Sequence, residues 1–227
     1  MAKVRDTEIG GALVRAAALA APGPAELKLL DSSEHRRAAT FHNPADAADF
    51  LAGRAALRLF AAELAGTSPA ALVAAYRCTR CGGGEGDHGQ PGYLLQDGGA
   101  GPLLSLSRAD GWVVLAGAAD GGSLSGIGVD VEQAGRTAFP GFDALVLTPR
   151  ERTCLAPATT AEGRGQRARF WTRKEAFLKS TGEGLGRDPA TCDVTAERLE
   201  GALLADLEPA RLGLPSGTVA ALALRQE

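Results

Sequence analysis

The stretch that decides the fold lies at residues 170–185 and reads FWTRKEAFLKSTGEGL. Its apolar residues gather on one side of a helix, and Gly182 supplies the stop that a helix end prefers. Glu175 and Lys179 lie four residues apart, so a helix places them on one face, about one turn from each other. The stretch therefore predicts a helix that presents a carboxylate beside an ammonium group. A solvated ion pair on an ordinary helix surface would have the same spacing.

A second stretch, at residues 126–132, reads GIGVDVE and alternates strictly along its length. A β-strand would turn its branched apolar residues to one face and place Asp130 and Glu132 on the other, about 7 Å apart. Two carboxylates this close repel each other unless a cation lies between them. With Glu175 from the helix, three carboxylates could hold a hard cation such as Mg²⁺ and leave positions for phosphate oxygens, whose charge Lys179 would neutralise. The alternative is an amphipathic strand with a solvated acidic face.

These two stretches, in this order and about 40 residues apart, resemble the signature pair of the 4′-phosphopantetheinyl transferases. The chain length and the upstream material resemble the long, surfactin-synthetase-activating type rather than the short homotrimeric synthases. The resemblance implies a holo-[acyl-carrier-protein] synthase type enzyme that moves the 4′-phosphopantetheine arm of coenzyme A to a serine of an apo acyl or peptidyl carrier protein. It implies release of 3′,5′-ADP, Mg²⁺ (or Mn²⁺) as the metal, and a place in fatty acid, polyketide or nonribosomal peptide biosynthesis.

The resemblance also implies an α+β fold in two similar halves, each a small antiparallel sheet packed on a long helix, related by a pseudo-twofold axis. Residues 116–125 are rich in glycine and serine, as a linker should be, so we expect halves at residues 1–118 and 119–227, the second carrying both motifs. Because fused halves can supply what separate subunits would, we expect a monomer. A faint internal repeat agrees with this architecture: Leu30–Glu34 is spaced like Leu147–Glu151, and Phe50–Arg54 like Phe170–Lys174.

Composition narrows the classes of partner. The net charge of −3 gives no electrostatic case for nucleic acid, and no stretch approaches the roughly 18 apolar residues of a membrane span. Four cysteines in 227 residues do not make a disulfide framework. We therefore expect a cytoplasmic protein without nucleic-acid or membrane partners. Cys78, Cys81 and His88 supply three zinc-type ligands, and a loop with free thiols is the alternative, since no fourth ligand is near in sequence.

The coenzyme A contacts are implied by the resemblance. Basic residues near the end of the first helical stretch, residues 24–41, would bind the 3′-phosphate, with Arg37 the best-matched position and Arg36 the next. An exposed basic helix end is the alternative for both. Arg54 and Arg58 share a face of a helix expected near residues 45–65, and we interpret them as structural or solvated.

Two positions depart from the family pattern. The family commonly has Gly-Lys-Pro where this chain has Gln90 in the middle, and Ser-His-Ser where this chain reads Ser107-Arg108-Ala109. Gln90 can hydrogen-bond to a coenzyme A phosphate but brings no charge. Ser107 and Arg108 would contact the phosphates, and Arg108 adds a permanent charge in a planar fork. The alternative for Arg108 is a surface loop arginine.

The roles that follow combine the residues with the resemblance. Asp130, Glu132 and Glu175 would hold the metal, and Glu175 would accept the serine proton, directly or through a metal-bound water. Lys179 would stabilise the leaving diphosphate. Lys174 points about 100° away from Glu175 around the helix, so we expect it to bind a phosphate or to face the outer surface.

Two other functions remain open at this stage. Gln90 and Arg108 motivate a non-catalytic paralogue that grips coenzyme A or a carrier domain without transfer. Similar carboxylates would also serve a magnesium-dependent hydrolase of nucleotide pyrophosphates. Carrier domains are usually acidic, so a basic run at residues 164–173 is a possible docking surface, with ordinary solvation as the alternative. That run consists of Arg164, Arg167, Arg169 and Arg173.

Overall fold

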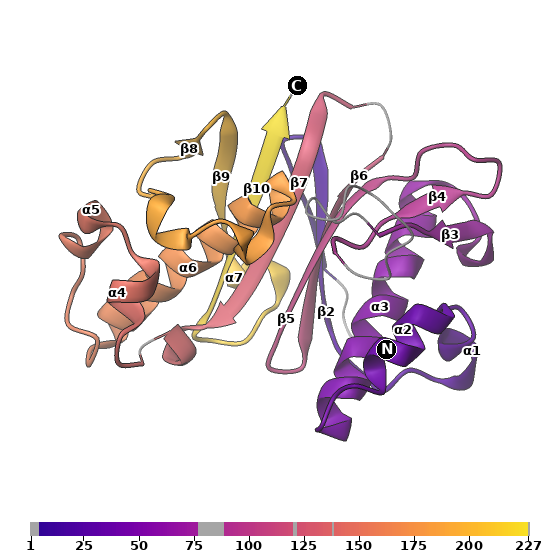
Figure 1. Ribbon diagram of the computed structural model, residues 1–227, viewed down its shortest axis with the longest axis horizontal. Helices are drawn as coiled ribbons and strands as arrows, with labels where there is room; N and C mark the ends of the chain where they lie inside the picture. The colour runs from indigo at the N-terminus through magenta and orange to yellow at the C-terminus, as the bar shows by residue number, and fades with distance from the viewer. Residues whose placement is uncertain (1–4, 77–88, 120–121, 138, 227) are drawn as a thin grey trace.

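The computed structural model describes residues 5–76, 89–119, 122–137 and 139–226. They form a mixed α+β fold built on two four-stranded antiparallel sheets (Figure 1). The first sheet has the strand order β1-β2-β6-β5 and the second the order β7-β10-β9-β8. The strands of the first sheet are β1 (Arg5–Ile9), β2 (Ala12–Ala18), β5 (Leu103–Ala109) and β6 (Trp112–Ala118). Those of the second are β7 (Leu124–Gln133), β8 (Arg198–Leu199), β9 (Ala202–Leu207) and β10 (Thr218–Gln226).

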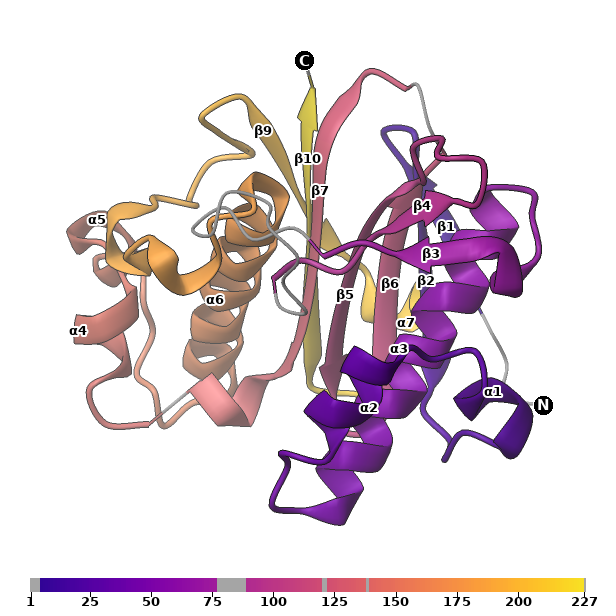
Figure 2. The same ribbon diagram turned by 45° about the vertical axis from the view of Figure 1, so that its right-hand side comes forward.

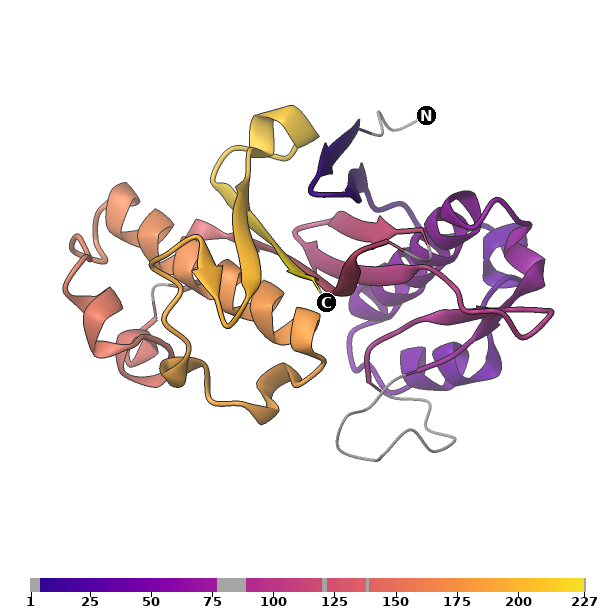
Figure 3. The ribbon, with the colours of Figure 1, turned by 90° about the horizontal axis from the view of Figure 1, so that it is seen from above.

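Each sheet carries one long helix on its outer face. Helix α3 (Pro44–Leu64) packs on the first sheet and α6 (Ala161–Thr181) on the second, so that helix, sheet, sheet and helix follow one another across the molecule (Figure 3). The shorter helices are α1 (Pro24–Leu27), α2 (Ser32–Ala38), α4 (Phe142–Val146), α5 (Pro149–Arg152) and α7 (Pro209–Leu212). A small ladder pairs β3 (Leu72–Ala74) with β4 (Tyr93–Leu95), and 3₁₀ turns lie at Pro69–Ala71, Ala134–Thr137, Gly184–Gly186 and Pro189–Thr191. In the described ranges, no helix combines the length and the apolar character that a membrane span requires.

The central core lies between the two sheets. Alternate residues of β2 and β6 pack there against Ile127, Val129 and Val131 of β7. Because these three point inward, Asp130 and its neighbour Gly128 face the opposite side, toward α6. The alternation predicted for residues 126–132 is confirmed.

The helix expected at the second motif is also confirmed, and Gly182 ends it in the left-handed conformation at φ 74°. The stretch at residues 24–41 is not one helix. Asp31 interrupts it, because its carboxylate accepts the Glu34 N–H while the Glu34 carboxylate accepts the Asp31 N–H, which starts α2 afresh. This capping box buries Glu34 to 2% exposure.

The two sides of residue 119 share several features. All strands of the first sheet precede residue 119, and all strands of the second follow it. The long helix has 21 residues on each side. Like Glu34, Glu151 is the buried partner of a capping box, with Thr148. The pseudo-twofold axis and the boundary at 118/119 stay predictions.

Two glycines set the distance between α6 and β7. A Cβ atom on Gly128 would lie 1.9 Å from the Ala176 carbonyl oxygen, and one on Gly126 would lie 2.2 Å from the Ser180 carbonyl oxygen. Neither carbonyl can yield without displacing the helix backbone. Glycine at these positions therefore allows α6 to lie directly on the strand that carries Asp130.

We predict that Gly128→Ala lowers the free energy of unfolding by about 3 kcal/mol, because α6 must move away from β7 to admit the methyl group. Denaturant unfolding measures the change. The control is Gly135→Ala, where a Cβ atom meets nothing within 4 Å, and we expect a change below about 0.5 kcal/mol there. Equal effects of the two substitutions would contradict the close-packing interpretation.

Candidate functional site

Strand β7 and helix α6 bring the acidic residues of both motifs together. Asp130 is only 4% exposed, and its Oδ1 atom accepts two hydrogen bonds. One comes from the Lys179 Nζ at 2.6 Å and the other from the Ser107 Oγ at 2.7 Å. Lys179 also donates to the Val129 carbonyl oxygen at 3.1 Å. The site thus joins a residue of the first sheet, Ser107, to the motif strand and helix of the second.

The carboxylates hold acceptor oxygens that the described residues leave without a hydrogen bond. These are Asp130 Oδ2 and Glu175 Oε1, both buried. A buried acceptor without a partner is unfavourable, so these two atoms need a donor or a cation from outside the described residues.

The electrostatics indicate the same deficit of positive charge. Burial raises the pKa of Glu175 to about 7, and the charges of Asp130 and Glu132 contribute to the rise while Lys179 opposes it. Burial raises the pKa of Glu132, and the charge of Asp130 raises it further. The Arg136 charge and a hydrogen bond from Trp171 lower it in part. Carboxylates that repel each other in a half-dry site favour a cation between them.

These observations fit a hard divalent cation in their chemistry, since the donors are carboxylate oxygens and two of them are orphaned. As the side chains lie, no three acidic, histidine or cysteine groups in the described part of the chain converge closely enough to hold a metal ion together. The ammonium of Lys179 is the cation that Asp130 contacts instead. Asp130, Glu132 and Glu175 as metal ligands stay a prediction.

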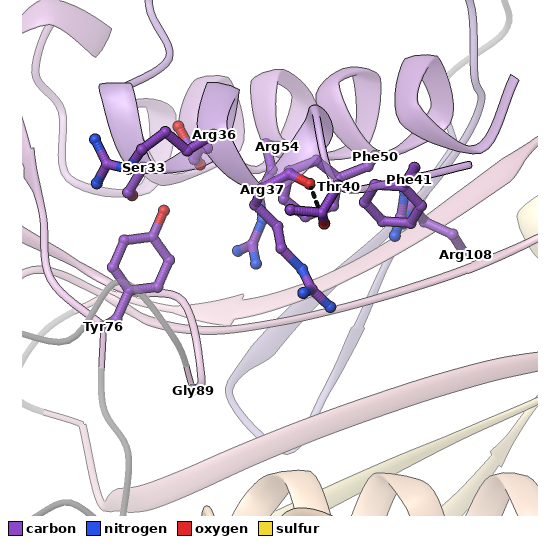
Figure 4. Close-up of a pocket in the computed structure, with 11 residues that line it drawn as sticks. Ser33, Arg36, Arg37, Thr40, Phe41, Phe50, Arg54, Tyr76, Gly89 and Arg108 are labelled. Atoms are coloured by element: carbon purple, nitrogen blue, oxygen red, sulfur yellow. Dashed lines mark hydrogen bonds between the residues drawn. The ribbon is translucent and has the colours of Figure 1, made fainter. Parts of the chain in front are cut away.

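An arginine-lined pocket of about 530 Å³ lies on the first half of the chain. Figure 4 shows side chains from α2, α3 and β5 around it. Arg37 and Arg36 line it together with Arg54 and Arg108. Phosphate binding by Arg37 and Arg36 stays a prediction. The remaining lining residues are Ser33, Glu34, Thr40, Phe41, Phe50, Tyr76 and Gly89.

Arg54 and Arg108 bring two partly buried positive charges to this pocket. Both guanidinium groups lie against the Phe50 ring, at 5.1 and 5.4 Å from its centroid. Arg54 Nη1 is buried without a hydrogen-bond partner in the described structure. Burial and the charge of Arg54 lower the pKa of Arg108. Such a pair is suited to an anion that would satisfy the orphaned donor.

A second pocket, of about 320 Å³, extends from this region to Lys179. It shares Phe50, Arg54 and Arg108 with the first pocket and is also lined by Lys179. Its other lining residues are Leu106 and Ser107. We call it the passage, because it extends from the arginines to the ammonium that contacts Asp130.

Two residues, Lys174 and Arg54, lie differently from what the sequence suggested. Lys174 is fully buried, and its ammonium donates to Glu151 at 2.8 Å and to the main-chain oxygens of residues 189 and 192. The expected position at the outer surface is therefore wrong, and a contact between Lys174 and a phosphate stays a prediction. Arg54 is not merely structural or solvated, whereas Arg58 is structural: it is buried and donates to the Leu72 carbonyl oxygen at 2.9 Å.

Gln90 lies between the two sheets. Its side-chain amide donates to the Leu104 carbonyl oxygen at 3.1 Å and to the Ile127 carbonyl oxygen at 3.5 Å. It lines a separate pocket of about 80 Å³ and not the arginine-lined one. A contact between Gln90 and coenzyme A stays a prediction. Cys78, Cys81 and His88, the possible zinc ligands, lie outside the described residues.

The basic run at residues 164–173 is largely paired within the fold, and its use as a docking surface stays a prediction. Arg167 pairs with Asp143 at 2.7 Å, and Arg169 and Arg173 both pair with Asp206. Arg164 donates to the carbonyl oxygen of residue 159. Charges held in this way bind neighbouring elements and offer little to a partner.

The missed residue, Arg54, did leave a trace in the sequence. It follows Phe50 by four residues on a helix, which stacks the guanidinium on the ring. What the sequence could not reveal is that Arg108, from a strand about 50 residues further on, approaches the same ring.

The arginine-lined pocket thus lies next to the passage, which reaches Lys179, the partner of Asp130. We call Asp130, Glu132 and Glu175 the acidic cluster. Residues 126–214 match the family model of the 4′-phosphopantetheinyl transferase superfamily. No curated protein matches the chain. The matched residues are less than half of the chain, from within β7 to just beyond α7, and they include the acidic cluster but not the arginine-lined pocket. The match supports a transferase and leaves its subtype open.

We predict that, without divalent metal, Glu175→Gln becomes more stable relative to the wild type as pH rises. The quantity compared is the free energy of unfolding. A carboxyl with a folded pKa of about 7 confers stability that is fully present below its unfolded pKa of 4.5 and is lost as pH rises through about 7. The difference should grow by roughly 2 kcal/mol between pH 5 and pH 8.

Denaturant unfolding at several pH values measures this difference. Glu162→Gln, at an exposed position on the same helix, serves as the control and should track the wild type. If the difference in unfolding free energy between Glu175→Gln and the wild type stayed constant with pH, burial would not raise the pKa of Glu175.

Proposed function

We propose that the chain is a Mg²⁺-dependent transferase that moves 4′-phosphopantetheine from coenzyme A to a serine of an apo carrier protein and releases 3′,5′-ADP. The observation that carries this proposal is the passage, which joins the arginine-lined pocket to Lys179, whose ammonium contacts Asp130. Coenzyme A needs both ends of such a site, because its nucleotide carries a 3′-phosphate and its reacting group is a diphosphate. The match of residues 126–214 to the superfamily supports the same reaction.

The chain's own residues have separate tasks in this proposal. Arg37, Arg54 and Arg108 bind the phosphates of the nucleotide end, and Lys179 neutralises charge on the diphosphate in the passage. Asp130, Glu132 and Glu175 would hold Mg²⁺, which when bound supplies charge neutralisation at the diphosphate oxygens. Ser107 holds Asp130 in place through its hydroxyl hydrogen bond.

The transfer forms a bond between the carrier serine oxygen and the β-phosphorus. It breaks the bond from that phosphorus to the oxygen bridging the α-phosphate, and that oxygen leaves with 3′,5′-ADP. The serine proton passes to Glu175, directly or through one water. Phosphoryl transfer depends mostly on positioning and charge neutralisation, and these residues supply both.

The proposed enzyme is of the long, single-chain, surfactin-synthetase-activating type. The two four-stranded antiparallel sheets, the two 21-residue helices and the two buried capping-box glutamates support two related halves in one monomer. One half would then serve the nucleotide and the other the metal and the reacting phosphorus.

The decisive measurement is the intact mass of an apo carrier protein after incubation with the chain, coenzyme A and Mg²⁺. We expect a gain of one phosphopantetheine arm that is lost when the metal is chelated. Glu175→Gln and Asp130→Asn should each lower the transfer rate by about 100-fold or more, whereas Glu162→Gln should leave it unchanged.

Two results would reject this function. Coenzyme A binding without any mass gain, across several carriers, would favour the non-catalytic paralogue. Free phosphopantetheine in the absence of a carrier would favour the hydrolase.

We further predict that Arg54→Met weakens coenzyme A binding about tenfold or more, because it removes a buried charge that the anion would satisfy. Calorimetry measures the dissociation constant. Arg198→Met, an exposed arginine on β8, is the matched control and should bind as the wild type does. Unchanged affinity in Arg54→Met would show that the arginine-lined pocket is not the nucleotide site.

A further inference from the structure

Lys179 lies between the two charged parts of the site. Its ammonium is 2.6 Å from Asp130 Oδ1, while its side chain, 26% exposed, lines the passage beside Arg54 and Arg108. The Asp130 side chain itself is only 5% exposed. The passage is therefore the open side from which a ligand can reach the lysine.

Asp130 is satisfied on one oxygen only. The Oδ1 atom takes hydrogen bonds from Lys179 and Ser107, and the Oδ2 atom has no partner among the described residues. As long as Lys179 stays there, the carboxylate is neutralised by an internal cation, and a divalent cation must compete with it for the same charge.

The Lys179 side chain is flexible enough to contact an anion bound in the passage instead of Asp130. An anion in the passage would lie against three cationic side chains, Arg54, Arg108 and Lys179, that line it. A lysine ammonium on a four-carbon chain exchanges one anionic partner for another with little rearrangement of the backbone.

We propose that Lys179 is a two-position counter-ion: without a bound anion it neutralises Asp130, and with a phosphate anion in the passage it turns to that anion and frees Asp130 for the metal. This inference rests on the proposed function, which supplies both ligands. It predicts that the phosphate ligand and the metal each strengthen the binding of the other, and by the same factor.

The test uses Mn²⁺ as the metal probe and 3′,5′-ADP as the anion, with free Mn²⁺ measured by electron paramagnetic resonance. Mn²⁺ affinity is measured with and without saturating nucleotide, after correction for Mn²⁺ bound to nucleotide alone. In the wild type we expect the nucleotide to tighten Mn²⁺ binding about tenfold, the equivalent of one charge-assisted hydrogen bond. In Lys179→Met we expect Mn²⁺ to bind about tenfold more tightly without nucleotide, and the nucleotide to add less than about twofold.

Lys28→Met, an exposed lysine on the first half, is the matched control and should reproduce the wild type in both arms. Lys179→Gln is a second variant with the same expected result, in case the methionine disturbs folding. If Lys179 acted only as a distant positive charge, its removal would strengthen Mn²⁺ binding by the same factor with and without nucleotide. That result, or an unchanged Mn²⁺ affinity in both variants, would overturn the proposal.

The outcome is separable from that of the proposed function. A missing mass gain on the carrier would reject the transfer reaction, while the Mn²⁺ measurements without nucleotide would still decide whether Lys179 competes for Asp130. Conversely, suppose that the wild type transfers the arm to the carrier and that Lys179→Met leaves Mn²⁺ binding unaltered. That result would reject the two-position lysine and would not contradict the transferase.

Discussion

The close approach of α6 to β7 is the constraint on which the rest of the structure depends. Gly126 and Gly128 leave room for the helix backbone itself to rest on the strand. At the usual helix-to-sheet spacing the side chains of both elements would fill the space between them. Here that space is absent, so Lys179 on the helix comes within hydrogen-bond distance of Asp130 on the strand. The acidic cluster is a product of this packing.

The two halves of the molecule contribute opposite charges to one site. The first half supplies partly buried guanidinium groups stacked on Phe50, and the second supplies partly or fully buried carboxylates. Each set alone is electrostatically unfavourable, because like charges lie together in a partly dry environment. A ligand that carries phosphates at one end and recruits a cation at the other relieves both. This is the physical reason why we propose a nucleotide diphosphate, and not a neutral substrate, as the ligand of this site.

The sequence predicted the local structure of the motifs well. Strict alternation fixed the faces of β7, and the spacing of Glu175 and Lys179 placed both toward the strand. It failed where the answer depends on what covers a helix face. Lys174 and Arg54 follow a phenylalanine at the same spacing, yet Lys174 is sealed against Glu151 and Arg54 borders a pocket. Helical periodicity gives the direction of a side chain, but burial is decided by elements distant in sequence, such as β5 with Arg108.

The seam between the sheets has a consequence for how the protein avoids aggregation. Strands β5 and β7 each lie at the edge of their own sheet, yet they run side by side (Figure 2). In place of a backbone ladder, Ser105 accepts the Val129 N–H, and Gln90 donates to the main chain of both strands. The two edges therefore shield each other, and the other sheet edges, β1 and β8, have only five and two residues. Separating the halves would expose two long unpaired edges to other chains, so the junction also protects solubility.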